Sequence, residues 1–144
     1  MLEMDDRIKS IVDKFEIQEL LTAYAHAIDE RDFAALPNMF TPDAQIDYSA
    51  TGGIKGGLDE IIPFLKSSLP LFKASQHFVT NPKITLSGET ATSKCLLFNP
   101  MVMDRDGTPH TLFIGAWYHD ELVRTAQGWR ISNRSQSLAF FHNQ

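Results

Sequence analysis

Apolar positions in the first thirty residues recur three and four residues apart. The series comprises Ile8, Ile11, Val12, Phe15, Leu20, Leu21, Tyr24, Ala25 and Ile28. This spacing is typical of one face of an amphipathic helix. It predicts a helix from about residue 6 to residue 31, with Asp5 or Asp6 as its N-cap.

The apolar row of this helix ends in a carboxylate. Asp29 follows Leu21 and Ala25 at four-residue intervals, so it lies on or beside the face that the pattern buries. It is also close to the predicted C-terminus, where the helix dipole disfavours negative charge and favours Lys or Arg. We therefore expect another part of the chain to provide a partner for Asp29.

The middle of the chain predicts shorter elements. Asp32 is a candidate N-cap, and Ile46 and Tyr48 alternate onto one face of a strand. The predicted elements are a short helix at 33–39, a turn at 41–43, a strand at 44–48, a glycine-rich loop at 52–57 and a third helix at 58–69.

From residue 74 onward the pattern predicts strands. Short glycine-containing connections between them are typical of hairpin turns. The element order predicts one α+β domain over residues 1–144, with a strongly curved, mostly antiparallel sheet wrapped around helices. The four strands are expected at 75–86, 90–103, 110–124 and 128–141.

Composition narrows the function classes. A hydrophobic fraction of 43% and a charged fraction of 22% are ordinary for a soluble globular protein. A net charge of −5 without a run of Lys or Arg argues against a nucleic-acid surface. We find neither a secretory signal pattern nor an apolar run of membrane-spanning length, and the one cysteine, Cys95, fits a reducing compartment. We therefore expect a cytoplasmic protein that contacts neither membrane nor nucleic acid, with Cys95 in its core.

A candidate base follows in the first long strand. Alternation places His77, Val79 and Asn81 on one face, which offers a base and an amide if that face lines a cavity. A carboxylate such as Asp29, bonded to one nitrogen of His77, would fix its tautomer and stabilise the imidazolium. A core histidine, or an ion pair without catalytic role, fits the same residues, and spacing alone does not bring the two together.

Phenols and arginines extend the list of candidates. Tyr24 and Tyr48 can donate hydrogen bonds to a developing oxyanion or protonate a departing hydroxyl, although amphipathic packing with the hydroxyl reaching water is the commoner role of a lone tyrosine. Arg130 and Arg134 fall on the strand face opposite Ile131, which predicts solvent exposure unless a bulge changes the register.

Other chemistries have no support in the sequence. The five histidines have no paired-ligand spacing, and no dinucleotide fingerprint is present. We therefore expect no metal and no cofactor.

Four segments in this order resemble the SnoaL-like branch of the nuclear transport factor 2-like superfamily. They are residues 24–33 (YAHAIDERDF), 46–48 (IDY), 76–81 (QHFVTN) and 128–131 (GWRI). The resemblance covers nearly the whole chain. It implies a cone-shaped α+β barrel whose curved, mixed sheet folds round the long first helix and encloses a deep pocket.

Within the superfamily the chain looks most like scytalone dehydratase, bile-acid 7α-dehydratase and hexachlorocyclohexane dehydrochlorinase. The resemblance implies a cofactor-free lyase with an Asp–His dyad, and it matches the dyad to Asp29 and His77. It matches pocket tyrosines to Tyr48 and Tyr24, and a late-strand arginine to Arg134. Met101 stands where scytalone dehydratase has a second pocket histidine, so the scytalone substrate itself is not implied.

The sequence thus predicts a dehydratase-type lyase for a hydrophobic, ring-containing small molecule. Asp29, His77, Tyr24 and Tyr48 are the predicted catalytic residues. The predicted substrate-binding residues are Leu21, Ile28, Phe33, Val79, Asn81, Leu97, Met101, Tyr118 and Arg134. An isomerase or polyketide cyclase with the same base, or a non-catalytic ligand-binding or assembly module, are the alternatives.

An assembly of copies is also expected. Leu96 and Phe98 on one strand, with Phe113 and Trp117 on the next, make the predicted outer face of the sheet too apolar for free solvent. The sequence therefore predicts a homo-oligomer, a dimer or a trimer, with the trimer preferred.

Overall fold

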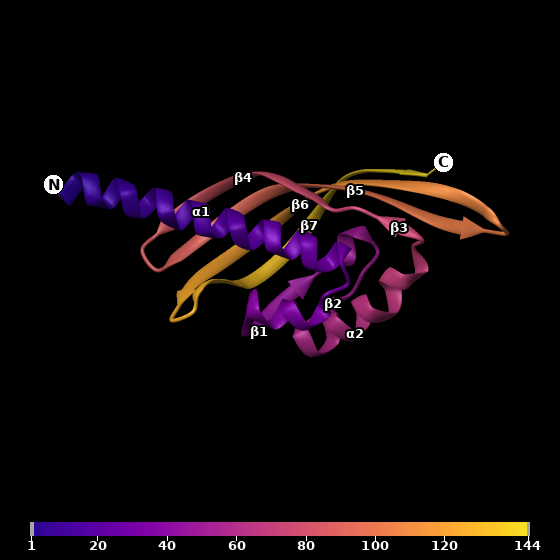
Figure 1. The fold of residues 1–144 in the computed structure, drawn as a ribbon, viewed down its shortest axis with the longest axis horizontal. Helices are drawn as coiled ribbons and strands as arrows, with labels where there is room; N and C mark the ends of the chain where they lie inside the picture. Colours follow the sequence, from indigo (N-terminus) through magenta and orange to yellow (C-terminus); the bar gives the residue numbers. More distant parts are fainter. Residues whose placement is uncertain (1, 144) are drawn as a thin grey trace.

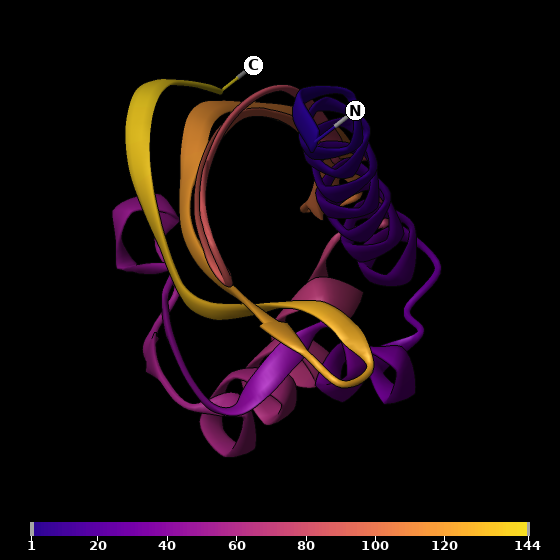
Figure 2. The ribbon, with the colours of Figure 1, turned by 90° about the vertical axis from the view of Figure 1, so that its left-hand side faces the viewer.

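The computed structural model describes residues 2–143 and the side chains of residues 5–143. Helix α1 (Leu2–Asp29) lies across the open side of a curved sheet (Figures 1 and 2). Because the helix already begins at Leu2, the predicted N-cap at Asp5 or Asp6 is wrong. The helix ends at Asp29, and Arg31 adopts a left-handed backbone with φ 61° that turns the chain away.

The apolar stripe of α1 is buried only in its second half. Ile17, Leu21, Tyr24 and Ile28 lie in the core, in contact with the inner face of the sheet. The first turns extend beyond the sheet (Figure 1), and their apolar residues, Ile8, Ile11, Val12 and Phe15, are exposed.

One curved sheet holds every strand of the described residues. Its order is β2-β1-β7-β6-β5-β3, with β4 also paired to β5, and β1–β7 is its parallel pair. The sheet curls without closing (Figure 2), and this mixed α+β architecture confirms the predicted fold class. The strands are β1 (Phe40–Asp47), β2 (Lys55–Gly56), β3 (Ala74–Ser75), β4 (Phe78–Ser87), β5 (Thr90–Arg105), β6 (Thr108–Thr125) and β7 (Gly128–Asn143).

Short helices connect these strands. They are η1 (Phe33–Asn38), η2 (Ser49–Thr51), α2 (Leu58–Ser68) and η3 (Leu69–Leu71). Asp32 precedes η1 but makes no side-chain cap, contrary to the prediction. The turn predicted at 41–43 lies inside β1, where the register with β7 slips, and the loop predicted at 52–57 contains β2. Within the described part of the chain no helix combines the length and apolarity needed to cross a membrane.

Two irregularities interrupt the strand predicted at 75–86. Gln76 and His77 lie between β3 and β4 rather than inside one continuous strand. Further along, the register with β5 shifts between Thr80 and Lys83, and Asn81 takes a positive φ of 53°. The predicted alternation therefore fails at Asn81, whose side chain is exposed.

A bulge in β7 changes the orientation of Arg134. Leu122 pairs with Ile131 and Glu121 with Asn133, which leaves Ser132 without a partner residue on β6. Because the extra residue shifts the alternation, Ile131 and Arg134 both face the core. The prediction that Arg134 is solvent-exposed is wrong. The strand contains a bulge, which is the case that the sequence prediction excepted.

Arg134 forms a buried ion pair with Asp120. Its Nε lies 2.7 Å from Oδ1 and its Nη2 2.9 Å from Oδ2, and both side chains are fully buried. The guanidinium lies 4.3 Å from the ring centre of Tyr24 and 4.0 Å from that of Tyr118. Burial disfavours the charge, but the Asp120 carboxylate outweighs it and the pKa of Arg134 stays well above its usual value. The pair forms the polar centre of the core.

Removing one member of this pair should be more damaging than removing both. Asp120→Ala leaves an unpaired buried guanidinium, and we expect it to lower the free energy of unfolding by about 3–5 kcal/mol. The double variant Asp120→Leu/Arg134→Met replaces the pair by apolar side chains and should lose less. Urea denaturation measures both, and a double variant as unstable as the single would contradict this account.

Candidate active site

A cavity lies between the inner face of the sheet, the second half of α1, and the α2–η3 segment. Its volume is about 270 Å³, just below the roughly 300–1,000 Å³ of pockets for drug-sized ligands. The lining is mainly apolar. It comprises Tyr24, Ile28, Tyr48, Thr51, Gly52, Gly53, Phe64, Leu65, Ser68, Leu69, Leu71, Phe72, His77, Leu97, Asn99, Met101, Ile114, Tyr118 and Gln136.

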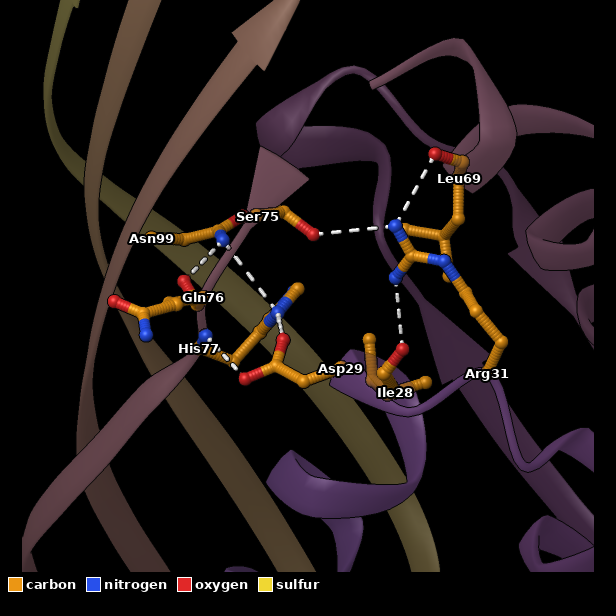
Figure 3. A network of polar contacts seen from close by, with 8 residues as sticks. All are labelled: Ile28, Asp29, Arg31, Leu69, Ser75, Gln76, His77 and Asn99. Carbon is orange, nitrogen blue, oxygen red and sulfur yellow. Dashed lines mark hydrogen bonds and ion pairs between the residues drawn. The ribbon is translucent and has the colours of Figure 1, made fainter. Parts of the chain in front are cut away.

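Asp29 and His77 are joined by two hydrogen bonds (Figure 3). The backbone N–H of His77 donates to Oδ2 of Asp29 at 2.9 Å, and ring Nδ1 lies 2.7 Å from Oδ1. Because an ionised carboxylate only accepts, Nδ1 carries the proton of the neutral ring and Nε2 is the basic nitrogen. His77 lines the cavity, whereas Asp29 lies behind it and borders an outer crevice beside Arg31 and Lys73.

Arg31 connects the end of α1 to the segments around His77 through hydrogen bonds. Its Nη1 donates to the carbonyl of Ile28 at 2.8 Å, and its Nη2 lies 3.3 Å from the carbonyl of Leu69 and from Oγ of Ser75 (Figure 3). The guanidinium therefore caps the helix C-terminus and links it to η3, which covers the cavity.

Three buried phenols form another part of the cavity wall. Oη of Tyr24 and Oη of Tyr48 are 2.5 Å apart, and the ring of Tyr118 meets that of Tyr24 edge-on at 5.9 Å. Burial raises the pKa of all three tyrosines, although the charge of Arg134 acts in the opposite direction. The phenols are therefore protonated at neutral pH and act as hydrogen-bond donors.

The structure separates the predicted site residues into groups. Tyr24, Tyr48 and His77 line the cavity, together with four of the predicted binding residues, Ile28, Leu97, Met101 and Tyr118. The other predicted binding residues do not line the cavity. Leu21 and Val79 border a separate crevice with Cys95, Phe33 packs against the core, Asn81 is exposed, and Arg134 lies behind Tyr24 and Tyr118.

Several cavity residues escaped the sequence analysis. Asn99 is the clearest, because it is a polar residue within the apolar stretch from Cys95 to Met101 of β5. Phe64 and Phe72 come from the α2–η3 segment, whose position over the cavity no local pattern indicates. Among residues 2–143, no three His, Cys, Asp or Glu side chains gather as metal ligands would.

Because of the hydrogen bonds to Asp29, the free energy of unfolding should depend on pH in the acid range. Burial disfavours its charge, but the bonds from His77, aided by Arg31, outweigh this and lower the pKa of Asp29. The resulting stabilisation is present above the unfolded-state pKa of about 3.9 and is lost as pH falls through the lower native value. We expect the difference in unfolding free energy between wild type and Asp29→Asn to shrink below about pH 4. Urea titrations between pH 2 and pH 7 test this, and a pH-independent difference would contradict it.

Comparison with known proteins agrees with this architecture. A family model described as "SnoaL-like domain" matches residues 9–135. The chain is 44% identical to the uncharacterized protein Rv2910c of Mycobacterium tuberculosis (strain ATCC 25618 / H37Rv) over 133 residues, which cover 92% of this chain and 90% of the relative.

Solved structures share the fold. The Kfla4162 protein of Kribbella flavida is 28% identical, with a TM-score of 0.82 over 92% of this chain and 95% of that one. An NTF2-like protein with a cystatin-like fold from Novosphingobium aromaticivorans is 23% identical, with a TM-score of 0.79 over 96% and 90%. The hexachlorocyclohexane dehydrochlorinase LinA-type3 of Novosphingobium barchaimii is 18% identical, with a TM-score of 0.79 over 96% and 92%.

The last two likenesses concern the fold alone. The family model spans most of the chain, and the mycobacterial relative matches nearly all of it. The chain belongs to the SnoaL-like domain family.

Proposed function

We propose that this protein is a cofactor-independent lyase of the dehydratase type, with His77 as its general base. The observation that carries the proposal is the attachment of His77. Two bonds to Asp29 occupy its backbone N–H and Nδ1, while the ring lines the cavity and no hydrogen bond within residues 2–143 engages Nε2. A histidine held in this way has its basic nitrogen free for a ligand.

In the proposed reaction, Nε2 takes a proton from a carbon next to an activating carbonyl. Asp29 stabilises the imidazolium that forms, and the hydrogen-bonded pair Tyr24–Tyr48 donates its remaining O–H to the developing oxyanion. The C–H electron pair becomes a carbon–carbon double bond as the hydroxyl on the next carbon leaves. The imidazolium returns its proton to that hydroxyl, so the products are an unsaturated compound and water.

The cavity supports a hydrophobic ring compound as substrate. Its wall is aromatic and aliphatic, and its volume of about 270 Å³ suits one or two rings. One structural neighbour is named a hexachlorocyclohexane dehydrochlorinase, and loss of HCl from a ring is also an elimination. This likeness supports the reaction class, although it is a likeness of fold.

The phenol cluster favours a second candidate, an isomerase or polyketide cyclase with the same base. In the pair Tyr24–Tyr48 one hydroxyl donates to the other, and the second O–H remains to donate to an enolate oxygen, as a tyrosine does in the oxyanion hole of ketosteroid isomerase. Proton abstraction is common to both reactions, so the two differ only in the fate of the enolate.

Elimination is tested with 3-hydroxycyclohexanone and 3-hydroxy-1-tetralone, followed by the absorbance of the unsaturated product. We expect His77→Gln to reduce the rate by about 10²–10⁴-fold, because general-base catalysis contributes about that much. Tyr48→Phe should cost about 10²-fold as one oxyanion donor is lost. His119→Gln is the matched control, since His119 bonds Ser137 away from the cavity and should leave the rate unchanged.

The same samples in D₂O separate the alternatives. Exchange of the carbon-bound proton without elimination would favour the isomerase or cyclase. A protein that binds these compounds but catalyses neither exchange nor elimination would be the non-catalytic binding module, and the lyase proposal would be wrong.

We also propose that copies of the chain associate as a dimer or trimer. Phe78, Phe98, Phe113 and His142 form an aromatic row across four strands, with ring centres 6.0, 6.1 and 6.3 Å apart. About half of the surface of Phe78 is exposed, and Phe140, on the same face of β7 as His142, is similarly exposed. Contiguous apolar surface of this kind marks an interaction site.

Light scattering tests this assembly. We expect wild type to have two or three times the 16.2 kDa mass of one chain, and Phe78→Asp to shift it toward the monomer by placing a charge in the apolar contact. Glu121→Gln, an exposed polar change elsewhere on the sheet, serves as control. A monomeric wild-type protein would refute the proposal.

A further inference from the structure

Asn99 presents a buried amide to the cavity beside His77. The side chain comes from β5, and only 4% of the residue is exposed. Its Nδ2 donates to the carbonyl of Gln76 at 2.6 Å (Figure 3), which fixes the orientation of the amide. Nδ2 also lies 3.5 Å from Nδ1 of His77, but both nitrogens carry protons, so the amide gains no second bond there.

The oxygen of this amide has no hydrogen-bond partner among the described residues. No hydrogen bond within residues 2–143 uses Oδ1 of Asn99, although an amide oxygen can accept two. An acceptor enclosed in a cavity loses free energy unless a ligand or water supplies a donor. By contrast, Gln136, the other amide of the cavity, already accepts a bond from Oγ1 of Thr51 at 2.6 Å.

We propose that Oδ1 of Asn99 binds a hydroxyl group of the substrate, close to the carbon that His77 deprotonates. This inference rests on the cavity being the substrate site of the proposed function, but not on any bond being broken there. Asn99 is then a specificity-determining residue, and its bond to Gln76 is what holds the acceptor in place.

The two polar positions of the cavity define a substrate class. The hydrogen-bonded pair Tyr24–Tyr48 is protonated and keeps one O–H to donate, so it favours a carbonyl or other oxygen acceptor. Asn99 offers an acceptor, so it favours a group that donates. The substrate is therefore a small ring compound with an oxygen acceptor for the phenols and a free hydroxyl for Asn99, and in the proposed elimination it carries the leaving hydroxyl as a third oxygen. Because an amide oxygen has no proton to give, the hydroxyl on Asn99 is retained in the reaction rather than lost.

Calorimetry with dihydroxynaphthalenes and their monomethyl ethers tests this substrate class. The probes are 1,6-dihydroxynaphthalene with its two monomethyl ethers, and 2,6- and 2,7-dihydroxynaphthalene with the one monomethyl ether that each forms; the ethers keep both oxygens but lose one donor. We expect at least one diol to bind wild type about three- to tenfold more tightly than one of its ethers, because a neutral hydrogen bond contributes about that factor. Equal affinities across every pair, or no saturable binding of any probe, would overturn the proposal.

Variants assign the preference to Asn99. Asn99→Leu removes the acceptor and should reduce the diol-to-ether ratio to within about twofold. Gln136→Leu is the matched control and should leave the ratio unchanged. Comparison of ratios within one variant removes any general loss of stability, which thermal unfolding records separately.

A purely structural role of Asn99 gives a different result. If the amide acted only by holding Gln76 and His77, Asn99→Leu would weaken the diol and its ether equally and the ratio would persist, which would refute the assignment. These binding constants do not depend on turnover. A failure of the lyase proposal, seen as diol-selective binding without catalysis, is therefore distinguishable from a failure of the Asn99 proposal.

Discussion

The carboxylate of Asp29 links helix α1 to the curved sheet. The link lies where the helix ends and where one strand of the sheet is interrupted. Helix α1 ends at Asp29, and the strand that should run past it is interrupted between β3 and β4. The interruption leaves the backbone N–H of His77 without a sheet partner, and Asp29 accepts it together with Nδ1. A buried N–H needs such a partner, so the same bond that satisfies the broken strand also orients the imidazole toward the cavity.

A second pair of charged side chains lies in the core, and it does not line the cavity. Arg134 and Asp120 are fully buried and face the rings of Tyr24 and Tyr118. An apolar replacement would serve stability as well or better, so stability alone does not explain the pair. Its position behind the phenols lets the guanidinium charge lower their pKa while burial raises it. The ion pair thus tunes the cavity wall without lining the cavity.

The sequence predicted the elements better than it predicted the orientation of their side chains. Helical spacing placed Tyr24 and Ile28 inward and raised the question of Asp29, because helical periodicity continues without interruption through α1. Strand alternation failed wherever a bulge added a residue. A single extra residue at Ser132 turned Arg134 inward, and the shift after Thr80 left Asn81 exposed. Local sequence does not announce such bulges, since their cost is offset by tertiary contacts made elsewhere.

Asn99 escaped detection for a related reason. Alternation along β5 indicates that Asn99 faces inward, but its importance comes from Gln76 and His77, which lie beside it because β3 and β4 pair with β5 in one register, Ser75 with Met101 and Phe78 with Phe98. The resemblance to a family supplied the partner of Asp29, which no pattern within the chain provides. Contacts between distant segments are the information that a single sequence lacks.

The raised pKa values of the phenols restrict how the proposed elimination runs. Burial raises the pKa of Tyr24 and Tyr48 and makes both weaker acids than a free phenol, so in the proposed reaction they act by hydrogen bonding. In the proposed reaction the imidazolium of His77 supplies the proton to the leaving hydroxyl. The group that removes the proton then also returns it, which requires the hydrogen and the departing hydroxyl to lie on the same face of the substrate ring. The double attachment to Asp29 suits this demand, because a ring held at both its backbone and Nδ1 keeps Nε2 in one place while the proton is taken and given back.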